Sequence, residues 1–531
     1  MAKGAPEFHP LGHNRRREPR PDRPAFAHDG GAFYRRRRMT GSRARIPDPG
    51  VIPAAHLSPA EFVENGRAVL DWLARYWSHI EDYPVLSRVR PGEIRARLPE
   101  AAPETGESFD EVMRDLDRIV VPGLTHWQSP SFFAFFPSNS SGPSVLGELL
   151  AAGLGVQGML WATSPACTEL ETHVLDWLVD LMELPAAFRS DGPGGGVIQD
   201  TASSATLTAL LAARERATGF ESNRVGVRAP LVVYGSEESH SSLLKAVRIA
   251  GLGGDNLRSI PADPVNRAAR PDAFAALVRE DLAAGRIPCF VTVTLGTTST
   301  GAFDPLDEIG RVAREHGVWV HVDAAMSGTA FLCPEFRHLQ AGLEFADSYC
   351  FNPHKWMFTN FDCDAFWVRD RRALIETLSV TPEYLRNRAS DAGEVLDYRD
   401  WHIPLGRRFR ALKLWLVLRH YGAAGLRDLI REHVALGQEF RGWVEAADDF
   451  EVLTPAPLNH VTFRYRRPGA SLDDLNRRLL DALNESGRLY LTHTRVPAGV
   501  ALRMVVAQTH TTRSHVGQAW DLITSTARGL P

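Results

Sequence analysis

A lysine stands directly after a short apolar segment, within the motif NPHKW at residues 352–356. The apolar segment, Tyr349–Phe351, is typical of a buried strand. A lysine flanked by aromatic residues at a strand end can be desolvated, which lowers its pKa and makes its amine a nucleophile toward carbonyl carbon. Taken alone, Lys355 also fits a surface lysine whose stem covers apolar neighbours.

Two further residues of chemical interest close other predicted strands. Asp323 ends the apolar run Val318–Val322, where a carboxylate is costly to bury unless it meets a cation or a donor. A protonated pyridine nitrogen is such a cation, and capping of the next helix is the structural alternative. His240 follows the run Leu231–Tyr234, and a lone histidine is most often structural.

A third feature is the stretch GGGVIQDTASSA at residues 194–205. Its pattern predicts a strand that passes through a turn of small residues into a helix. Free backbone N–H groups and the positive end of the helix dipole would then face an anion. Thr201, Ser203 and Ser204 add hydroxyl groups, although the same residues also fit an ordinary helix N-cap.

These residues need a scaffold, and the chain alternates short apolar runs with helical periodicity. Such alternation favours an α/β fold with an open, mainly parallel central sheet. Ligands of such sheets bind at the C-terminal ends of the strands, so we expect the residues above to share one site. The predicted strands are Val197–Ile198, Leu231–Tyr234, Cys289–Thr294, Val318–Val322 and Tyr349–Phe351, and the predicted helices include Leu175–Met182, Ala205–Arg216 and Phe409–Tyr421.

We expect four regions along the 531 residues, because the chain is too long for one core. Residues 1–50 form a disordered basic leader, and residues 57–140 form an N-terminal helical lobe. Residues 141–440 form the large domain, and residues 441–531 form a small C-terminal α+β domain. Ser58 is expected to cap a helix opened by Pro59, a second helix runs from Phe109 to Ile119, and the small domain's strands are Val461–Phe463 and Leu502–Val506.

Composition limits the class of protein. The chain has 60 Lys and Arg against 64 Asp and Glu, and its net charge is −4, although residues 1–50 are rich in arginine. A nucleic-acid-binding arm is one interpretation of this leader, but charge runs are usually solvated and the rest of the chain is acidic, so we expect no nucleic-acid partner. An unstructured leader without such a role, or a translation start at Met39, is the alternative. The five cysteines form no CxxC pair, and no apolar run is long enough to cross a bilayer, so we expect a cytoplasmic protein with no membrane contact.

The motifs together resemble those of group II pyridoxal-phosphate (PLP) dependent decarboxylases, specifically the aromatic-L-amino-acid decarboxylases. The resemblance runs from about Leu57 to about Leu522. It implies a type I aminotransferase-like fold, a homodimer with active sites at its interface, and decarboxylation of an aromatic L-amino acid to its amine. The most specific stretches are Ser164–Glu171, Val322–Ala325, Cys333–His338, Asn352–Trp356 and Ile403–Arg410.

The resemblance also implies a role for each matched residue. Lys355 would carry PLP as a Schiff base, and Asp323 would pair with the pyridine nitrogen. His240 would stack over the ring, Ala325 would lie beneath it, and Thr298 would contact the cofactor. Tyr384 would lie on a mobile loop over the site. The residues expected around the phosphate are Ala202, Ser203, Asn352 and His354.

For the substrate, the resemblance implies an apolar pocket, and no metal is expected. Gly406 favours tryptophan or 5-hydroxytryptophan, although relatives with glycine there also accept dihydroxyphenylalanine. An aldehyde synthase is a second possibility that Tyr384 and His240 disfavour, and Gln157 leaves open a decarboxylase of histidine or an aliphatic amino acid. The expected substrate-binding residues are Trp127, Phe135, Phe136, Ser138, Met159 and Gly406.

Overall fold

The computed structural model of the protein describes residues 56–380, 382–386 and 388–531. The predicted leader, residues 1–50, lies outside these residues and stays a prediction. The chain divides into two compact units, Met1–Val69 and Leu70–Pro531, and the second contains both β-sheets. Helix α1 (Pro59–Ser78) begins after Ser58, whose Oγ accepts from the Glu61 N–H at 3.3 Å as predicted.

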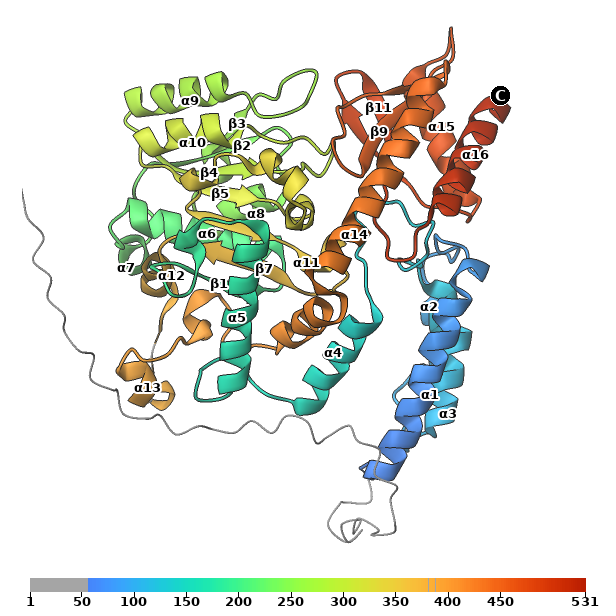
Figure 1. The fold of residues 1–531 in the computed structure, drawn as a ribbon, viewed down its shortest axis with the longest axis horizontal. Coiled ribbons are helices and arrows are strands. Elements are labelled where there is room, and N and C mark those ends of the chain that lie inside the picture. Colours follow the sequence, from blue (N-terminus) through green and yellow to red (C-terminus); the bar gives the residue numbers. More distant parts are fainter. Residues whose placement is uncertain (1–55, 381, 387) are drawn as a thin grey trace, which may run out of the picture. The chain divides into compact units, whose positions relative to one another are not determined.

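A seven-stranded sheet carries the large part of the second unit (Figure 1). Its strand order is β1-β7-β6-β5-β4-β2-β3, and only β7 runs antiparallel to its neighbours, so the predicted mainly parallel sheet is confirmed. All five predicted strands form, and β3 and β7 were missed. The strands are β1 (Gly195–Gln199), β2 (Leu231–Ser236), β3 (Leu257–Ile260), β4 (Ile287–Thr294), β5 (Trp319–Asp323), β6 (Ser348–Phe351) and β7 (Asp364–Val368).

Helices cover both faces of this sheet because its strands are apolar on both sides. Along β4, Val291 and Val293 pack into one core while Phe290 packs into the other. The first core includes α5 (Pro165–Met182), α9 (Pro271–Ala283), α10 (Leu306–Glu315) and the start of α14. The second core includes α6 (Ala202–Ala217), α8 (Ser242–Ile249) and α12 (Arg371–Leu378).

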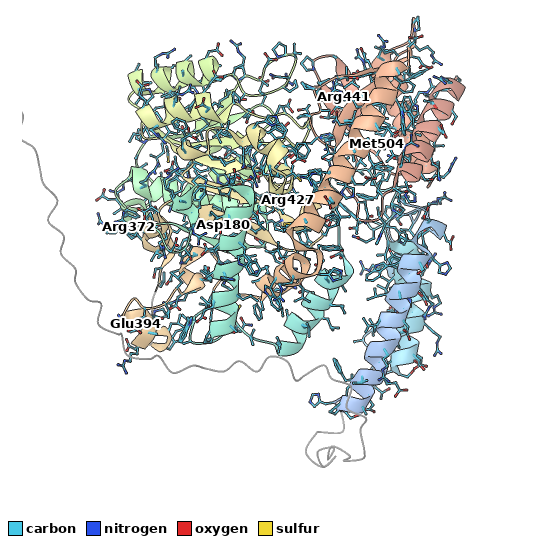
Figure 2. The ribbon with its side chains drawn as sticks, in the orientation of Figure 1. Asp180, Arg372, Glu394, Arg427, Arg441 and Met504 are labelled. Carbon is cyan, nitrogen blue, oxygen red and sulfur yellow. The ribbon has the colours of Figure 1, made fainter. Side chains whose placement is uncertain are left out.

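Helix α14 (Arg410–Ala446) links the two sheets, and Arg427 and Arg441 mark points along it in Figure 2. Its first part is the predicted helix Phe409–Tyr421, which ends at a kink where Gly422 adopts φ 67°. Helix α4 (Gly142–Leu154) packs closely on α14, since a Cβ at Gly147 would lie 2.6 Å from the Lys413 Cα.

The C-terminal part holds a four-stranded antiparallel sheet of order β10-β11-β9-β8, backed by α15 and α16. Both predicted strands of this region form: Val461–Phe463 lies within β9, and Leu502–Val506 overlaps β11 as far as Val505. Its elements are β8 (Phe450–Val452), β9 (His460–Tyr465), α15 (Leu472–Glu485), β10 (Thr492–Val496), β11 (Gly499–Val505) and α16 (Arg513–Gly529).

The remaining helices are short. The predicted helix from Phe109 starts as α3 (Phe109–Asp115), capped by Ser108, and continues as a π-helical turn, Leu116–Val120. Among the described residues, no helix combines the length and apolar character needed to span a bilayer. The others are α2 (Glu93–Arg97), α7 (Ser222–Val225), α11 (Pro353–Trp356) and α13 (Arg388–Asp391).

Candidate active site

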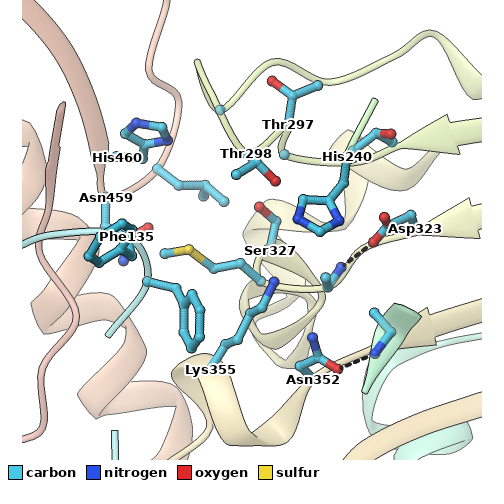
Figure 3. Close-up of a pocket in the computed structure, with 18 of the residues that line it drawn as sticks. Phe135, His240, Thr297, Thr298, Asp323, Ser327, Asn352, Lys355, Asn459 and His460 are labelled. Carbon is cyan, nitrogen blue, oxygen red and sulfur yellow. Dashed lines mark hydrogen bonds between the residues drawn. The ribbon is translucent and has the colours of Figure 1, made fainter. Parts of the chain in front are cut away.

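A cavity of about 310 Å³ lies at the C-terminal ends of the large sheet's strands (Figure 3). All nine residues predicted to hold the cofactor line it, and so do two of the six predicted to hold the substrate. The nine are Ala202, Ser203, His240, Thr298, Asp323, Ala325, Asn352, His354 and Lys355, and the two are Phe135 and Phe136.

Lys355 rises from the short helix α11, directly after β6. Desolvation by the surrounding protein lowers the pKa of its amine, while the charge of Asp323 opposes that shift. The Nζ atom lies 5.1 Å from the centre of the Phe136 ring. A lysine of lowered pKa has a larger neutral fraction, and the neutral amine is the form that attacks a carbonyl.

Asp323 ends β5 and is buried, as its position after an apolar strand predicts. Its Oδ1 accepts from the Ala325 N–H at 3.0 Å, which is drawn in Figure 3. Among the described residues, no Arg, Lys or His lies within ion-pair distance of it. A buried carboxylate with one backbone donor is suited to a cationic ligand group.

An anion cradle forms where β1 passes into α6. Thr201 holds the N-cap position, but its side chain makes no capping bond, so the helix end stays open to a ligand. The Ala202 N–H donates to Asn352 Oδ1 at 3.2 Å, which ties the cradle to the segment after β6. The dipole of the 16-residue α6 and the Ser203 hydroxyl favour a phosphate at this end.

Two histidines of the site are held in defined tautomers by backbone N–H groups. The Ser242 N–H points at His240 Nδ1 at 3.3 Å, and the Cys363 N–H donates to His354 Nδ1 at 2.9 Å. Each ring therefore carries its proton on Nε2 when neutral. Burial is the main cause that lowers the pKa of both, and for His354 it lowers the pKa to about 3, so both are neutral donors at pH 7.

An aromatic wall stands opposite these polar groups. Phe135 and Phe136 line the cavity, and Trp127 lies behind them with its ring centre 5.8 and 5.5 Å from theirs. Ser138 does not line the cavity, although the next residue, Asn139, donates to the Lys355 carbonyl at 3.3 Å. The wall is apolar and suits a flat aromatic side chain.

Tyr384, Met159 and Gly406 do not line the cavity either. Tyr384, in the short 3-10 turn Glu383–Leu385, is 77% exposed. Met159 and Gly406 belong to neighbouring segments, since the Gly158 N–H donates to the Arg407 carbonyl at 3.1 Å. A buried ion pair between Arg407 and Glu171, 2.6 Å apart, holds these segments in place.

Several lining residues were missed by the sequence analysis. Five of them come from the C-terminal part, where the strand pattern predicts β9 and β11 but gives no sign of what they face. Buried polar residues at strand starts were the available signal, because His460 opens β9. The missed polar residues include Ser327, Asn459, His460 and Arg503.

Known proteins match almost the whole described chain. Residues 91–466 match the model of the pyridoxal-dependent decarboxylase conserved domain. Phenylacetaldehyde synthase of Arabidopsis thaliana is 47% identical over 473 residues, which cover 88% of this chain and 96% of that protein. The chain belongs to the pyridoxal-dependent decarboxylase family.

Other members of the family agree. Aromatic-L-amino-acid decarboxylase of Rattus norvegicus is 45% identical over 478 residues, covering 88% of this chain and 98% of the rat protein. The crystal structure of Oryza sativa TDC with PLP and tryptamine superposes with a TM-score of 0.87 at 40% identity, covering 89% of this chain and 98% of that one. The predicted fold class is therefore confirmed.

The cofactor of the family is PLP, and the cavity fits it. The open N-terminus of α6 suits a phosphate, the buried Asp323 carboxylate suits a protonated ring nitrogen, and Lys355 supplies the amine for an aldehyde. In the part of the chain that the structure describes, no group of three His, Cys, Asp or Glu residues is placed to hold a metal ion. This pyridoxal-dependent decarboxylase thus has a group suited to the phosphate, the ring nitrogen and the aldehyde of PLP.

Proposed function

We propose that the protein removes carbon dioxide from an aromatic L-amino acid and releases the corresponding amine. One observation carries the proposal: a lysine amine, a buried carboxylate and an anion cradle converge on one cavity that has an aromatic wall. The first three groups suit PLP, and the wall suits the substrate side chain. When bound, PLP supplies the electron sink that allows the bond between Cα and the carboxylate to break.

The chain's own residues would divide the remaining work. Lys355 would hold the cofactor's aldehyde through its amine, and Asp323 would keep the ring nitrogen protonated. Ala202, Ser203, Asn352 and His354 would hold the phosphate, and His240 and Ala325 would hold the ring. Thr298 would contact the cofactor from the turn after β4.

The functional form would be a homodimer in which each chain completes the other's substrate site. Helix α4 exposes four leucines, between 46% and 60% of each side chain, and Ile403 and Leu405 are exposed beside Gly406. Apolar side chains gathered in this way are typical of a protein interface. A second copy seated there would bring Met159, Gly406 and Tyr384 to its partner's cavity. The four leucines are Leu146, Leu149, Leu150 and Leu154.

We propose the substrate from the residue at position 406 and the cellular compartment from the state of the cysteines. A Cβ at Gly406 would lie 3.5 Å from Gln157 Oε1, at ordinary contact distance. In plant relatives a glycine at this position goes with indolic substrates, so tryptophan or 5-hydroxytryptophan is favoured over a phenolic substrate. The five cysteines are free and buried, which suits the reducing cytoplasm.

Aldehyde synthesis is the second candidate, since a phenylacetaldehyde synthase is among the similar proteins. After carbon dioxide leaves, Cα must take up a proton, and a hydroxyl held over the site delivers it quickly. The chain has a tyrosine at 384 and a histidine at 240, as decarboxylases of this family tend to have. We therefore assign amine release as the main reaction.

The test is a panel of the twenty L-amino acids with the PLP-loaded protein, read out by amine detection. 5-Hydroxytryptophan and dihydroxyphenylalanine are added to the panel. Amine is expected from tryptophan or from one of these two added substrates, and not from aliphatic amino acids or histidine. Turnover of histidine or an aliphatic amino acid alone would contradict the aromatic assignment.

A further inference from the structure

A buried arginine reaches the cavity from the C-terminal sheet. Arg503 lies on β11, is 6% exposed, and lines the cavity that the large sheet forms. No Asp or Glu pairs with it in the described parts of the chain, although 35 ion pairs are found there. Burial without a counter-charge lowers the pKa of its guanidinium to about 10, so it is still charged at pH 7. Such a group is costly unless its hydrogen bonds are well used.

Its donors are used on both sides of the cavity. On one side, Nη2 donates to the Thr298 carbonyl at 2.6 Å and Nε donates to the Ser299 carbonyl at 3.1 Å. On the other side, Nη2 donates to the Phe135 carbonyl at 3.3 Å. One side chain therefore connects the turn after β4 with the aromatic wall.

A threonine on the next strand completes the connection. Thr492 of β10 is the cross-strand partner of Arg503, and Arg503 Nη1 donates to Thr492 Oγ1 at 2.9 Å. The same Oγ1 accepts from the Phe135 N–H at 3.5 Å. Both backbone polar groups of Phe135 are thus bonded to this pair of residues.

Phe135 needs such support because its backbone is strained. Its φ is 48°, in the left-handed region that a bulky residue seldom adopts. Conformations of this kind persist only where the surroundings hold them. The ring is held as well, between Trp127 and Tyr490, each with its ring centre 5.8 Å away.

His460 orients the arginine from the neighbouring strand. Its Nε2 lies 3.2 Å from Arg503 Nε and accepts from it, so the proton of the neutral ring is on Nδ1. Burial is the main cause that lowers the pKa of His460, followed by the charge of Arg503, so the ring stays neutral. A neutral acceptor there fixes the guanidinium without adding charge.

We infer that Arg503 is a positioning residue for substrate selection: together with Thr492 it holds Phe135 in its strained conformation and sets the aromatic wall against the Thr298 turn. The inference rests on the proposed function, since the wall is where the substrate ring would bind. Arg503 makes no hydrogen bond to Lys355 or Asp323. It acts through Phe135 and Thr298.

The kinetic test uses the PLP-loaded protein and its best aromatic amino acid. Arg503→Gln is expected to raise KM about tenfold and to change kcat less than about threefold, because the wall binds the substrate ring equally before and during reaction. Arg503→Lys keeps the positive charge but loses the planar guanidinium with its several N–H donors. Its KM should therefore lie between those of the wild type and Arg503→Gln. Arg464→Gln is the matched control, since Arg464 lies on the same sheet and pairs with Glu451 instead.

Thr492→Val tests the same connection without touching a charge. It should raise KM about threefold, and its effect should not add to that of Arg503→Gln. If Arg503→Gln does not fold, this variant decides the question. Unchanged KM in both variants, or an equal rise in Arg464→Gln, would overturn the inference.

A second readout does not depend on turnover. Amide hydrogen exchange in residues 131–138 should become about tenfold faster in Arg503→Gln, while exchange in β9 stays the same. Unchanged exchange in residues 131–138 would also overturn the inference. A wild-type protein that releases no carbon dioxide from any aromatic amino acid would refute the proposed function alone, because exchange still tests the role of Arg503.

Discussion

Two groups of predicted site residues differ in whether they meet in a single chain: those at the base of the cavity, which we call its floor, and a second group, which we call the outer residues. The floor comes from strand ends of a single sheet, and Lys355, Asp323, Asn352 and Ala202 meet there without any partner. The outer residues, Met159, Tyr384 and Gly406, do not line the cavity. The cofactor site is therefore a property of the fold, whereas the proposed second copy would be needed to complete the substrate site.

This contrast predicts that changes in the floor and in the outer residues will have separable effects. Floor variants should lose cofactor chemistry whatever the state of assembly. Outer variants should keep the cofactor and alter rate, selectivity or product.

The largest effect is expected for Lys355→Ala. Carbon dioxide release should fall on the order of 10⁴-fold or more, since the nucleophilic amine is lost. The visible absorbance of lysine-bound PLP should disappear with it. Lys413→Ala is the matched control for a buried lysine, and it should keep the absorbance because its Nζ pairs with Glu148 at 2.8 Å. Residual absorbance in Lys355→Ala would show that another lysine reaches the cofactor.

Asp323→Asn should give the next largest effect. An amide is isosteric but cannot supply the negative charge that keeps a ring nitrogen protonated, so turnover should fall about 10²- to 10³-fold. Circular dichroism should remain that of the folded protein. Near-normal turnover with unchanged PLP affinity would refute the proposed role of this carboxylate.

Leu150→Glu tests whether the exposed leucines of α4 form the proposed dimer interface. A charge in the exposed leucine row of α4 should dissociate the dimer, seen by sedimentation, and lower turnover about tenfold at low protein concentration. Lysine-bound PLP should persist in the isolated chain. Leu282→Glu on α9, at a leucine that is 43% exposed against 52% for Leu150, is the control. A dimer that survives Leu150→Glu with full activity would contradict this interface.

Tyr384→Phe should have the smallest effect on carbon dioxide release and a clear effect on product. Phenylalanine keeps the shape of the turn but removes the hydroxyl that would protonate Cα. The share of aldehyde and peroxide per carbon dioxide, measured in air, should rise at the expense of amine. An unchanged ratio would show that Tyr384 is not the proton donor.

Much of the floor could be predicted from the sequence, because local sequence patterns indicate its strands and the residues that follow them. Apolar runs reveal β4, β5 and β6, and the unusual residues that follow such runs mark the site. β3 was missed since Arg258 and Ser259 interrupt its apolar pattern. These signals are local, and the topology of a parallel sheet brings them to one edge.

The support that the C-terminal sheet gives to the aromatic wall was not predictable in the same way. Arg503 sits in an apolar strand, Gly499–Val505, where a single arginine gives no sign of its partners. Its contacts, Phe135 and Thr298, lie 368 and 205 positions away in the chain. Only the packing of the two sheets shows that these residues meet.

The most direct test of the account is borohydride reduction of the PLP-loaded protein followed by peptide mapping. Reduction fixes the cofactor to whichever lysine holds it. We predict a single pyridoxyl group, on Lys355, in the dimer and in Leu150→Glu alike, because one chain completes the floor. A pyridoxyl group on another lysine, or none in Leu150→Glu, would contradict the central claim that the cofactor site is built within one chain.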